Sequence, residues 1–543
     1  MAVSKPARRP GRAPRRSARA ARPPAERAAL IVGLAVALAA GLARLAPTAA
    51  RLLGDWSRAP RAFVGDFAVL DIYLQHALRG ALWVGPYSRY GWHHPGPVWL
   101  YAMLPVYALS GRAPMAVVAW NLALTLLAAG LAVRLLIRRI EAPAAVLAAS
   151  LLALLVPQLG EQLVYPWNPF VVVAPFLLLV VVATLTVVEG LRWAPALVLL
   201  HAFLAQTHLG ALPAATGCAL AALLGLAARP DRASLARPRW ATRGAPLALA
   251  ALWAAPVVEQ LRAPVGNATL LARFFTDPAH APQPWGPALT AWAHVTFGMF
   301  LRPLGVVPGV ALAAALGLAA AAAFALGLAV ATRRRDLLAA SLCGFSLLAL
   351  AAALLSVRAI VGDIRSYLFA WATVATVPGL AGVAHLALRA APSRAARALV
   401  YGAAGLLCLG ALPGPATTVQ GVPIFDPALA RSAAAAADAV GPPRGQTVHV
   451  SQAEHDQWPD MAAVVDQLYR RGHRVAVRPG WTFMFGDTLG RPTTPPGAIV
   501  QLLSGALPHA GRGAAEDCQA RAPAGWTSVA VDGPRAAICV ATP

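Results

Sequence analysis

The chain has 543 residues, of which 58% are hydrophobic and only 13% are charged. This composition excludes an ordinary soluble protein of the same length. Apolar stretches recur from Leu30 to Leu412, separated by clusters of Arg, Pro or Trp. Because a bilayer presents about 30 Å of hydrocarbon to be crossed, such stretches predict a multi-pass protein of the plasma membrane.

The formal net charge of +24 does not indicate a nucleic-acid-binding protein. The basic residues lie in the amino-terminal tail and in short stretches between apolar runs, not along one continuous face. The tail, residues 1–27, holds many Lys and Arg residues against the single acid Glu26. We expect it to be disordered and to stay in the cytoplasm, and binding to anionic lipid is a second interpretation.

The first apolar run, Leu30–Ala49, is longer than the apolar core of a signal peptide, which is about 7–15 residues. We therefore expect it to be an uncleaved span. Placing the basic clusters inside orients about eleven spanning helices in an all-α bundle. The other ten are expected at Met115–Ile137, Ala144–Val156, Val171–Val188, Ala194–Ala205, Ala211–Ala228, Pro246–Leu261, Gly305–Ala331, Leu337–Leu355, Tyr367–Leu388 and Ala398–Leu412.

This topology divides the chain into a membrane domain, residues 28–416, with a first outer loop at 50–113, and an extracytoplasmic domain, residues 417–543. The short apolar stretch Val98–Leu109 does not fit as a span, because counting it would move the later basic loops outside. Its prolines also favour an interfacial or re-entrant segment.

The carboxy-terminal segment has the pattern of a small α/β domain. We expect strands at Thr447–Val450 and Arg474–Val477, with an amphipathic helix at Asp460–Arg471 between them. Export would also allow a disulfide between Cys518 and Cys539, the two cysteines of this segment.

The first outer loop has an early acid, Asp66, directly after Gly65. The apolar spacing that follows predicts a helix lying flat on the membrane. Asp66 could cap this helix, and it could also act as a general base or metal ligand at the lipid–water boundary. Asp71 is expected on another face of the helix, either as a solvated residue or as a second catalytic carboxylate.

The same loop continues with Gly85–Pro97, which is dense in turn-forming residues, aromatic residues and histidines. Arg89 offers a planar fork for phosphate, and His93 and His94 can exchange protons near neutral pH. An interfacial aromatic belt would account for the aromatic residues of the loop but not for the paired histidines.

Polar residues at the other outer turns repeat this theme. They gather on one side of the predicted topology, whereas the cytoplasmic turns hold mostly Arg, which indicates an outward-facing polar cavity. The candidate substrate-binding residues among them are Trp167, Asn168, Gln206, His208, Glu259, Arg358, Asp363 and Arg365.

The chain resembles the GT-C superfamily of membrane glycosyltransferases, especially the bacterial protein mannosyltransferase and lipid A aminoarabinose transferase group. The resemblance rests on the early acid Gly65-Asp66, on a His-Pro element, His94-Pro95-Gly96-Pro97, and on a multi-span body followed by an outer domain. Gly96 stands where many relatives have a second proline.

The resemblance implies transfer of a hexose or pentose from a polyprenyl-phosphate donor to an outer glycan, lipid or protein of a bacterial cell envelope. Asp66 would act on the acceptor hydroxyl, with Asp71 and Glu259 in reserve as a base or as ligands, with Asp66, of a divalent cation such as Mg²⁺ or Mn²⁺. His93, His94 and Arg89 would surround the leaving phosphate, and Arg358 or Arg365 would add positive charge.

Two other classes of function stay open at this point. A transporter or flippase of a lipid-linked or anionic substrate would carry ionisable groups near the bilayer midplane and an inverted repeat, and neither is clear in the sequence. A non-catalytic envelope assembly protein would use the outer domain to bind cell-wall partners.

Overall fold

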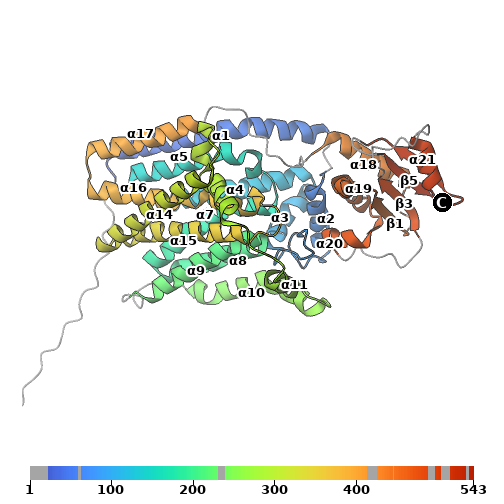
Figure 1. Cartoon of the computed structure of the whole chain (residues 1–543), viewed down its shortest axis with the longest axis horizontal. Helices are drawn as coiled ribbons and strands as arrows, with labels where there is room; N and C mark the ends of the chain where they lie inside the picture. The colour runs from blue at the N-terminus through green and yellow to red at the C-terminus, as the bar shows by residue number, and fades with distance from the viewer. Residues whose placement is uncertain are drawn as a thin grey trace, which may run out of the picture.

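The computed structural model describes residues 22–58, 63–229, 239–411, 425–443, 445–486, 489, 496–502, 514–533 and 537–543. A helical bundle and a smaller α/β domain lie side by side along the longest axis (Figure 1). Most of the predicted disordered tail lies outside the described residues.

Nine helices in this described part are long and apolar enough to cross a membrane, which confirms a multi-pass membrane protein. Each of these helices overlaps one of the predicted spans. They comprise α1 (Pro24–Arg58), α4 (Pro114–Ile137), α5 (Ala142–Leu159), α6 with α7 (Asn168–Val171 and Val173–Glu189), α9 (Leu212–Ala227), α10 (Arg239–Arg262), α14 (Val310–Arg333), α15 (Leu337–Arg358), and α16 (Thr376–Ala390) with the 3₁₀ turn Ser366–Val374 before it.

The other two predicted spans are also helices, but they fall below the length or hydropathy of a span. Helix α8 (Ala194–Thr207) has only 14 residues. Helix α17 (Arg394–Ala411) begins with Arg394 and Arg397, which lower its mean hydropathy. The number of crossings therefore stays a prediction.

Helix α1 corrects two predicted boundaries. It has 35 residues, from Pro24 to Arg58, and is thus about 50 Å long at 1.5 Å per residue. It starts inside the predicted tail and ends well after residue 50, where the first outer loop was expected to begin. Figure 1 shows it running along the bundle toward the α/β domain.

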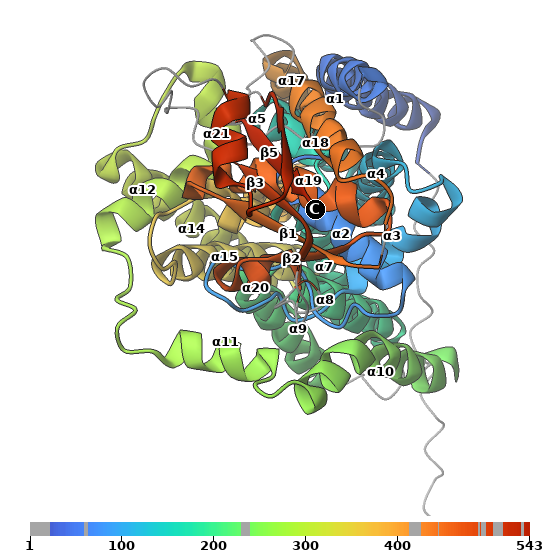
Figure 2. The same ribbon diagram turned by 90° about the vertical axis from the view of Figure 1, so that its right-hand side faces the viewer.

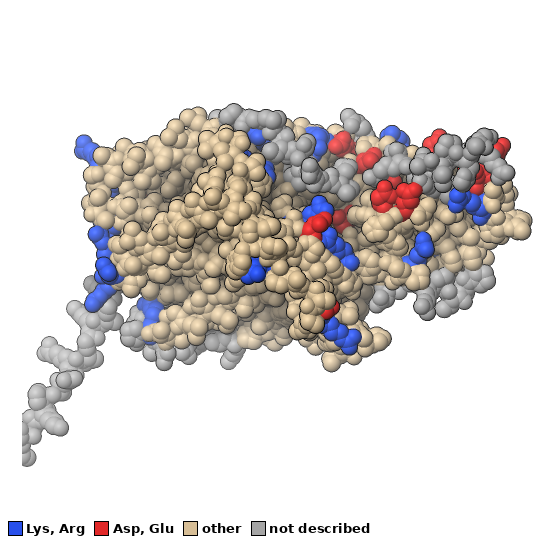
Figure 3. Space-filling view, viewed as in Figure 1, with Lys and Arg blue, Asp and Glu red and all other residues tan. Residues whose placement is uncertain are grey.

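Ion pairs link the helix ends at the end of the bundle far from the α/β domain. Arg139 pairs with Glu189 at 2.7 Å, Arg389 with Asp336 at 2.8 Å, and Arg397 with Glu26 at 3.2 Å. Lys and Arg side chains gather at this end in the space-filling view (Figure 3). These residues belong to the turns that were predicted to be cytoplasmic, so the two ends of the bundle differ as the sequence predicted, while their sidedness stays a prediction.

Helices α2 (Asp66–Leu78) and α3 (Val98–Leu109) lie between the bundle and the α/β domain (Figure 1). With 12 residues, α3 is too short to cross a membrane, as expected for an interfacial or re-entrant segment. The prediction of a single apolar face on α2 is wrong, because residues from Phe67 to Ala77 are buried on every side. Helix α2 packs against both α3 and α19 (Trp458–Arg470).

The α/β domain has a five-stranded sheet in the order β2-β1-β3-β5-β4. Strand β1 (Thr447–Gln452) is parallel to β2 (Arg474–Val477) and β3 (Pro496–Leu502), whereas β5 (Ile538–Thr542) is antiparallel to β3 and β4 (Thr527–Val531). The predicted strands and the predicted helix are therefore confirmed as β1, β2 and α19. The domain also contains α18 (Pro427–Val440), α20 (Thr482–Phe485) and α21 (Ala514–Arg521).

The predicted disulfide is present between Cys518 on α21 and Cys539 on β5, with a Cα–Cα distance of 5.2 Å.

In Figure 2 the sheet faces the viewer in front of the bundle, while α10 and α11 (Asn267–Thr276) lie at the periphery. A long connection joins α11 to α12 (Trp285–Thr296), which is followed by the short α13 (Gly298–Leu301).

A buried charged cluster joins the two domains. Asp71 on α2 is fully buried and accepts hydrogen bonds from Arg470 of α19 at 2.5 Å, from Tyr107 of α3 at 2.8 Å and from Gln75 at 2.8 Å. Arg470 also donates to Asp466 at 3.2 Å. Burial and the charge of Asp71 raise the pKa of Asp466 well above its ordinary value. This domain junction fixes the α/β domain against α2.

Candidate active site

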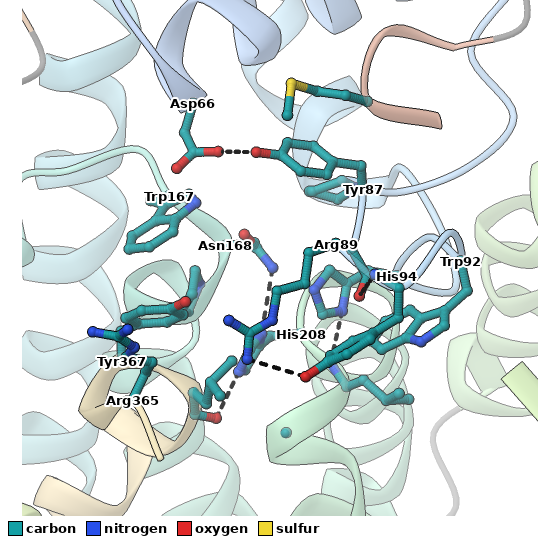
Figure 4. A pocket seen from close by; sticks show the side chains of 18 of the residues that line it. Asp66, Tyr87, Arg89, Trp92, His94, Trp167, Asn168, His208, Arg365 and Tyr367 are labelled. Carbon is teal, nitrogen blue, oxygen red and sulfur yellow. Dashed lines mark hydrogen bonds between the residues drawn. The ribbon is translucent and has the colours of Figure 1, made fainter. Parts of the chain in front are cut away.

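A cavity of about 1120 Å³ lies where α2, the ends of several bundle helices and the α/β domain meet. Figure 4 shows that residues far apart in the sequence surround it. Seven residues predicted from the sequence line it: Asp66, Arg89, His94, Trp167, Asn168, His208 and Arg365.

Asp66 is the first residue of α2, and its carboxylate is held by a tyrosine. The Tyr87 hydroxyl donates to Oδ1 of Asp66 at 2.5 Å, whereas Oδ2 accepts no hydrogen bond from the described residues. The capping interpretation of Asp66 is wrong, because Gly65 occupies the N-cap position and Asp66 is the first residue of the helix itself. Burial raises the pKa of Asp66 to about 6, against the lowering effect of the Tyr87 hydrogen bond. The carboxylate is therefore ionised near neutral pH and basic enough to accept a proton.

The Gly85–Pro97 loop folds back on itself beside Asp66. Gly85 donates its backbone N–H to His94 at 3.0 Å, and His94 donates back to Pro86 at 2.8 Å. Gly96 is closely packed: a Cβ atom there would lie 2.2 Å from the Gln206 side-chain oxygen and 2.8 Å from Cγ of Pro256, so a larger residue would require these side chains to shift. The glycine in the His-Pro element thus lets the loop approach the end of α8.

Two neutral histidines lie side by side in the cavity wall. Nδ1 of His94 accepts the backbone N–H of Leu209 at 3.0 Å, which leaves Nε2 to carry the proton. Burial and the neighbouring His208 and His93 hold the pKa of His94 well below its ordinary value. The His94 and His208 ring centroids are 5.1 Å apart.

His208 is oriented from both sides. Its Nε2 lies 2.8 Å from the carbonyl oxygen of Leu368, to which it donates, and its Nδ1 lies 3.3 Å from the amide nitrogen of Asn168. These contacts bring together three segments, α6, the residues after α8 and the 3₁₀ turn before α16. The arrangement leaves the Asn168 side-chain oxygen and the His94 N–H as polar groups for a ligand.

Positive charge enters the cavity from two exposed arginines. Arg89 donates to the Tyr90 hydroxyl at 3.1 Å, and Arg365 pairs with Asp363 at 2.7 Å. The aromatic rings of Trp167 and Tyr367 pack beside them, with centroids 4.7 Å apart and ring planes tilted by 43°. Among the described lining residues Asp66 is the only acid, so the cavity favours an anionic group.

Three predicted residues hold the wall without lining the cavity. His93 exchanges two backbone hydrogen bonds with the Asn267 side chain, at 2.7 and 2.8 Å. Glu259 accepts the backbone N–H of Asn267 at 3.0 Å, at the start of α11. Gln206 donates to the carbonyl of Leu252 on α10 at 2.9 Å. These contacts position α11, whose Phe274 and Phe275 line the cavity.

Three further predicted residues lie away from the cavity. Asp71 belongs to the domain junction. Arg358 stacks on Trp285, with its guanidinium carbon 3.8 Å from the ring centroid, and donates to the carbonyl of Gln283. Asp363 contributes only through its pair with Arg365. The structure thus gives structural partners to all three and brings none of them to Asp66.

The sequence prediction missed the contribution of the α/β domain to the cavity. His455 and Trp458 follow β1, and Trp481, Phe483 and Met484 follow β2, and all of them line the cavity. Tyr87 lies in the Gly85–Pro97 loop and Tyr367 begins a predicted span, and the sequence assigns neither a role at the site. The residues next to them in sequence do not predict these roles, because Tyr87 bonds Asp66 and Tyr367 packs against Trp167, both distant in the chain.

The described side chains that line the cavity include too few carboxylates to hold a metal ion by themselves. No group of three or more His, Cys, Asp or Glu residues suited to a metal ion occurs in the described residues. Of the three carboxylates predicted as possible ligands, Asp71 is bound to Arg470 at the domain junction and Glu259 is engaged at the start of α11, so only Asp66 reaches the cavity.

No family model and no curated protein matches this chain. Two solved structures of ArnT from Cupriavidus metallidurans do match it. The apo form has a TM-score of 0.55 at 13% identity, covering 95% of this chain and 98% of that chain. The chain has the ArnT fold. The second ArnT structure, bound to undecaprenyl phosphate, has a TM-score of 0.54 at 13% identity and covers 94% of this chain and 97% of that chain.

The GT-C resemblance is thereby confirmed for the fold, since ArnT is a GT-C protein and the match spans the bundle and the α/β domain together. At 13% identity, the match shows that the two proteins share a fold, but it does not show that they share substrates.

Proposed function

We propose that this chain is a membrane glycosyltransferase that moves a hexose or pentose from a polyprenyl-phosphate donor to a hydroxyl group on the outer side of the plasma membrane. The observation that carries the proposal is Asp66, a carboxylate with a pKa of about 6 that keeps one oxygen free for a substrate in a cavity otherwise positive in charge.

In the proposed reaction the acceptor hydroxyl oxygen attacks the anomeric carbon of the sugar, and the bond from that carbon to the phosphate oxygen breaks. Oδ2 of Asp66 takes the hydroxyl proton while the Tyr87 hydroxyl holds Oδ1. The phosphate leaves with the electron pair of the broken bond on the polyprenyl carrier.

Arg89 and Arg365 would stabilise the negative charge that develops on the leaving phosphate, because both line the cavity and carry fixed positive charge. The neutral His94 would donate its Nε2–H to a phosphate oxygen. A polyprenyl donor is supported by the ArnT structure that binds undecaprenyl phosphate. We assign no step to a divalent cation, because Asp66 is the only carboxylate among the described lining residues.

The proposal places α/β domain and cavity outside the cell and the amino terminus in the cytoplasm. The charge asymmetry of the two bundle ends supports this orientation. The acceptor then belongs to the cell envelope, as a glycan, a lipid or a protein.

The decisive experiment is lipid and glycan profiling of a strain that lacks the chain. We expect a sugar-charged polyprenyl phosphate to accumulate and the wild-type gene to remove it. A gene encoding the Asp66→Asn chain should leave the accumulation in place. Accumulation of an unexported substrate, or no change in any polyprenyl-linked sugar, would instead assign the protein to transport or to assembly.

A further inference from the structure

The α/β domain presents one particular edge to the cavity. Strands β1, β2 and β3 are parallel, and the segments that follow β1 and β2 supply every lining residue that this domain contributes within the described ranges. In open α/β sheets, ligands bind outside the carboxyl ends of the parallel strands. The edge that α/β proteins commonly use for ligands therefore faces Asp66.

Aromatic rings form a continuous row from this edge to the catalytic carboxylate. The His455 and Trp481 rings are 4.9 Å apart, Trp481 and Phe483 are 6.4 Å apart at an interplanar angle of 21°, and Phe483 meets the edge of Tyr87 at 5.8 Å. Tyr87 in turn bonds Asp66. We call His455, Trp481 and Phe483 the aromatic shelf.

Charge is divided between the two walls of the cavity. The bundle side carries Arg89 and Arg365, whereas the described lining residues of the α/β domain include no Lys, Arg, Asp or Glu. A phosphate-bearing group would be favoured on the bundle side. The shelf suits an uncharged group with a flat apolar face.

The isoprenoid chain of the donor is a poor occupant for the shelf. It must remain in hydrocarbon to avoid exposing its apolar surface to water, whereas the shelf belongs to the α/β domain, which lies past one end of the helical bundle (Figure 1). A group bound on the shelf instead lies beside Tyr87, the residue that bonds Asp66.

We propose that the aromatic shelf binds the ring of a neutral carbohydrate, which is the acceptor, and directs one of its hydroxyl groups toward Asp66. This inference rests on the proposed transferase function and narrows its acceptor from any envelope component to an uncharged sugar. The shelf supplies flat apolar faces for the C–H surface of the sugar ring. The part of the cavity beside Asp66 holds the sugar hydroxyl group.

The test measures binding without turnover, so that it does not depend on transfer. The full-length chain in lipid nanodiscs is examined by saturation-transfer NMR with maltotriose and chitotriose as neutral sugar probes. Farnesyl phosphate and a neutral Ser/Thr-rich decapeptide are the competing probes. We expect transfer of saturation to the ring protons of a trisaccharide and not to the peptide.

Variants then locate that binding. Trp481→Ala and Phe483→Ala should weaken trisaccharide binding about tenfold, because each removes an aromatic face. Trp481→Phe keeps such a face and should retain binding, and Trp526→Ala is the matched control, since Trp526 lies before β4 and outside the cavity lining. Farnesyl phosphate binding should not change in any of them.

Trisaccharide binding that is absent, or that survives Trp481→Ala and Phe483→Ala equally, would overturn the shelf assignment while leaving the transferase proposal intact. Loss of farnesyl phosphate or peptide binding in Trp481→Ala would overturn it in favour of a lipid or protein site. Conversely, trisaccharide binding at the shelf in a chain that leaves polyprenyl-linked sugars unchanged in the cell would remove only the transferase proposal.

Discussion

The two faces of α2 carry the same chemical group in opposite circumstances. On the cavity face, Asp66 accepts one hydrogen bond from the described residues, from Tyr87 to Oδ1, and its Oδ2 is left open. On the face toward the α/β domain, Asp71 is fully buried and accepts hydrogen bonds from Arg470, Tyr107 and Gln75. A buried carboxylate with all its partners holds structure together, whereas one that lacks partners and borders a cavity is available for chemistry.

The largest effect should come from Asp66→Asn. This change keeps the size of the side chain and removes its ability to accept a proton, so the transfer rate should fall by about 100- to 10,000-fold. The measurement is sugar transfer by the purified chain from a polyprenyl-phosphate donor. Membrane insertion and the melting temperature should match wild type, and an Asp66→Asn chain with near-normal turnover would remove Asp66 as the base.

Arg470→Met tests the other face of α2. It leaves Asp71 and Asp466 buried together without their shared cation, which should cost about 3–5 kcal/mol at the domain junction. The α/β domain should become sensitive to protease at a lower temperature. The matched control is Arg471→Met, because Arg471 pairs at the surface with the exposed Asp438 and should change stability by less than about 1 kcal/mol.

The pH dependence of transfer should report the raised pKa of Asp66. As a base, Asp66 must be deprotonated, so kcat/KM should be constant well above pH 6 and should fall as the pH drops below about 6. Tyr87→Phe removes the hydrogen bond that lowers this pKa and should therefore move the acid limb to higher pH. An acid limb that stays in place in Tyr87→Phe would assign it to another group.

The smallest effect should come from Arg358→Gln. Arg358 stacks on Trp285 outside the cavity, so its loss should change transfer by less than about twofold. Arg89→Gln is the contrasting variant, since it removes positive charge from the cavity and should raise the KM of the donor. Equal effects of the two changes on transfer would contradict the assignment of Arg89 to the cavity and of Arg358 to a structural contact outside it.

Much of the fold could be predicted from hydropathy and charge, since the predicted spans are helices and α19, β1 and β2 occur where their periodicity placed them. Asp66 could be found because it stands just before an apolar helical run. Asp71 could not be separated from it, because its partner Arg470 lies 399 residues away and no local pattern announces that contact. The same reason hides the contribution of Trp481 and Phe483, which look like ordinary loop aromatics.

The hydrogen bond from the Tyr73 hydroxyl to the carbonyl of Met484 joins residues 411 positions apart at 3.0 Å. Proteins emerge from the ribosome amino terminus first, so the helix that carries Tyr73 and Asp66 is synthesised long before α19 and α20, which pack against it. The cavity is then complete only when nearly the whole chain has been translated. A chain truncated before β1 would contain Asp66 and still lack the wall that the α/β domain adds to its cavity.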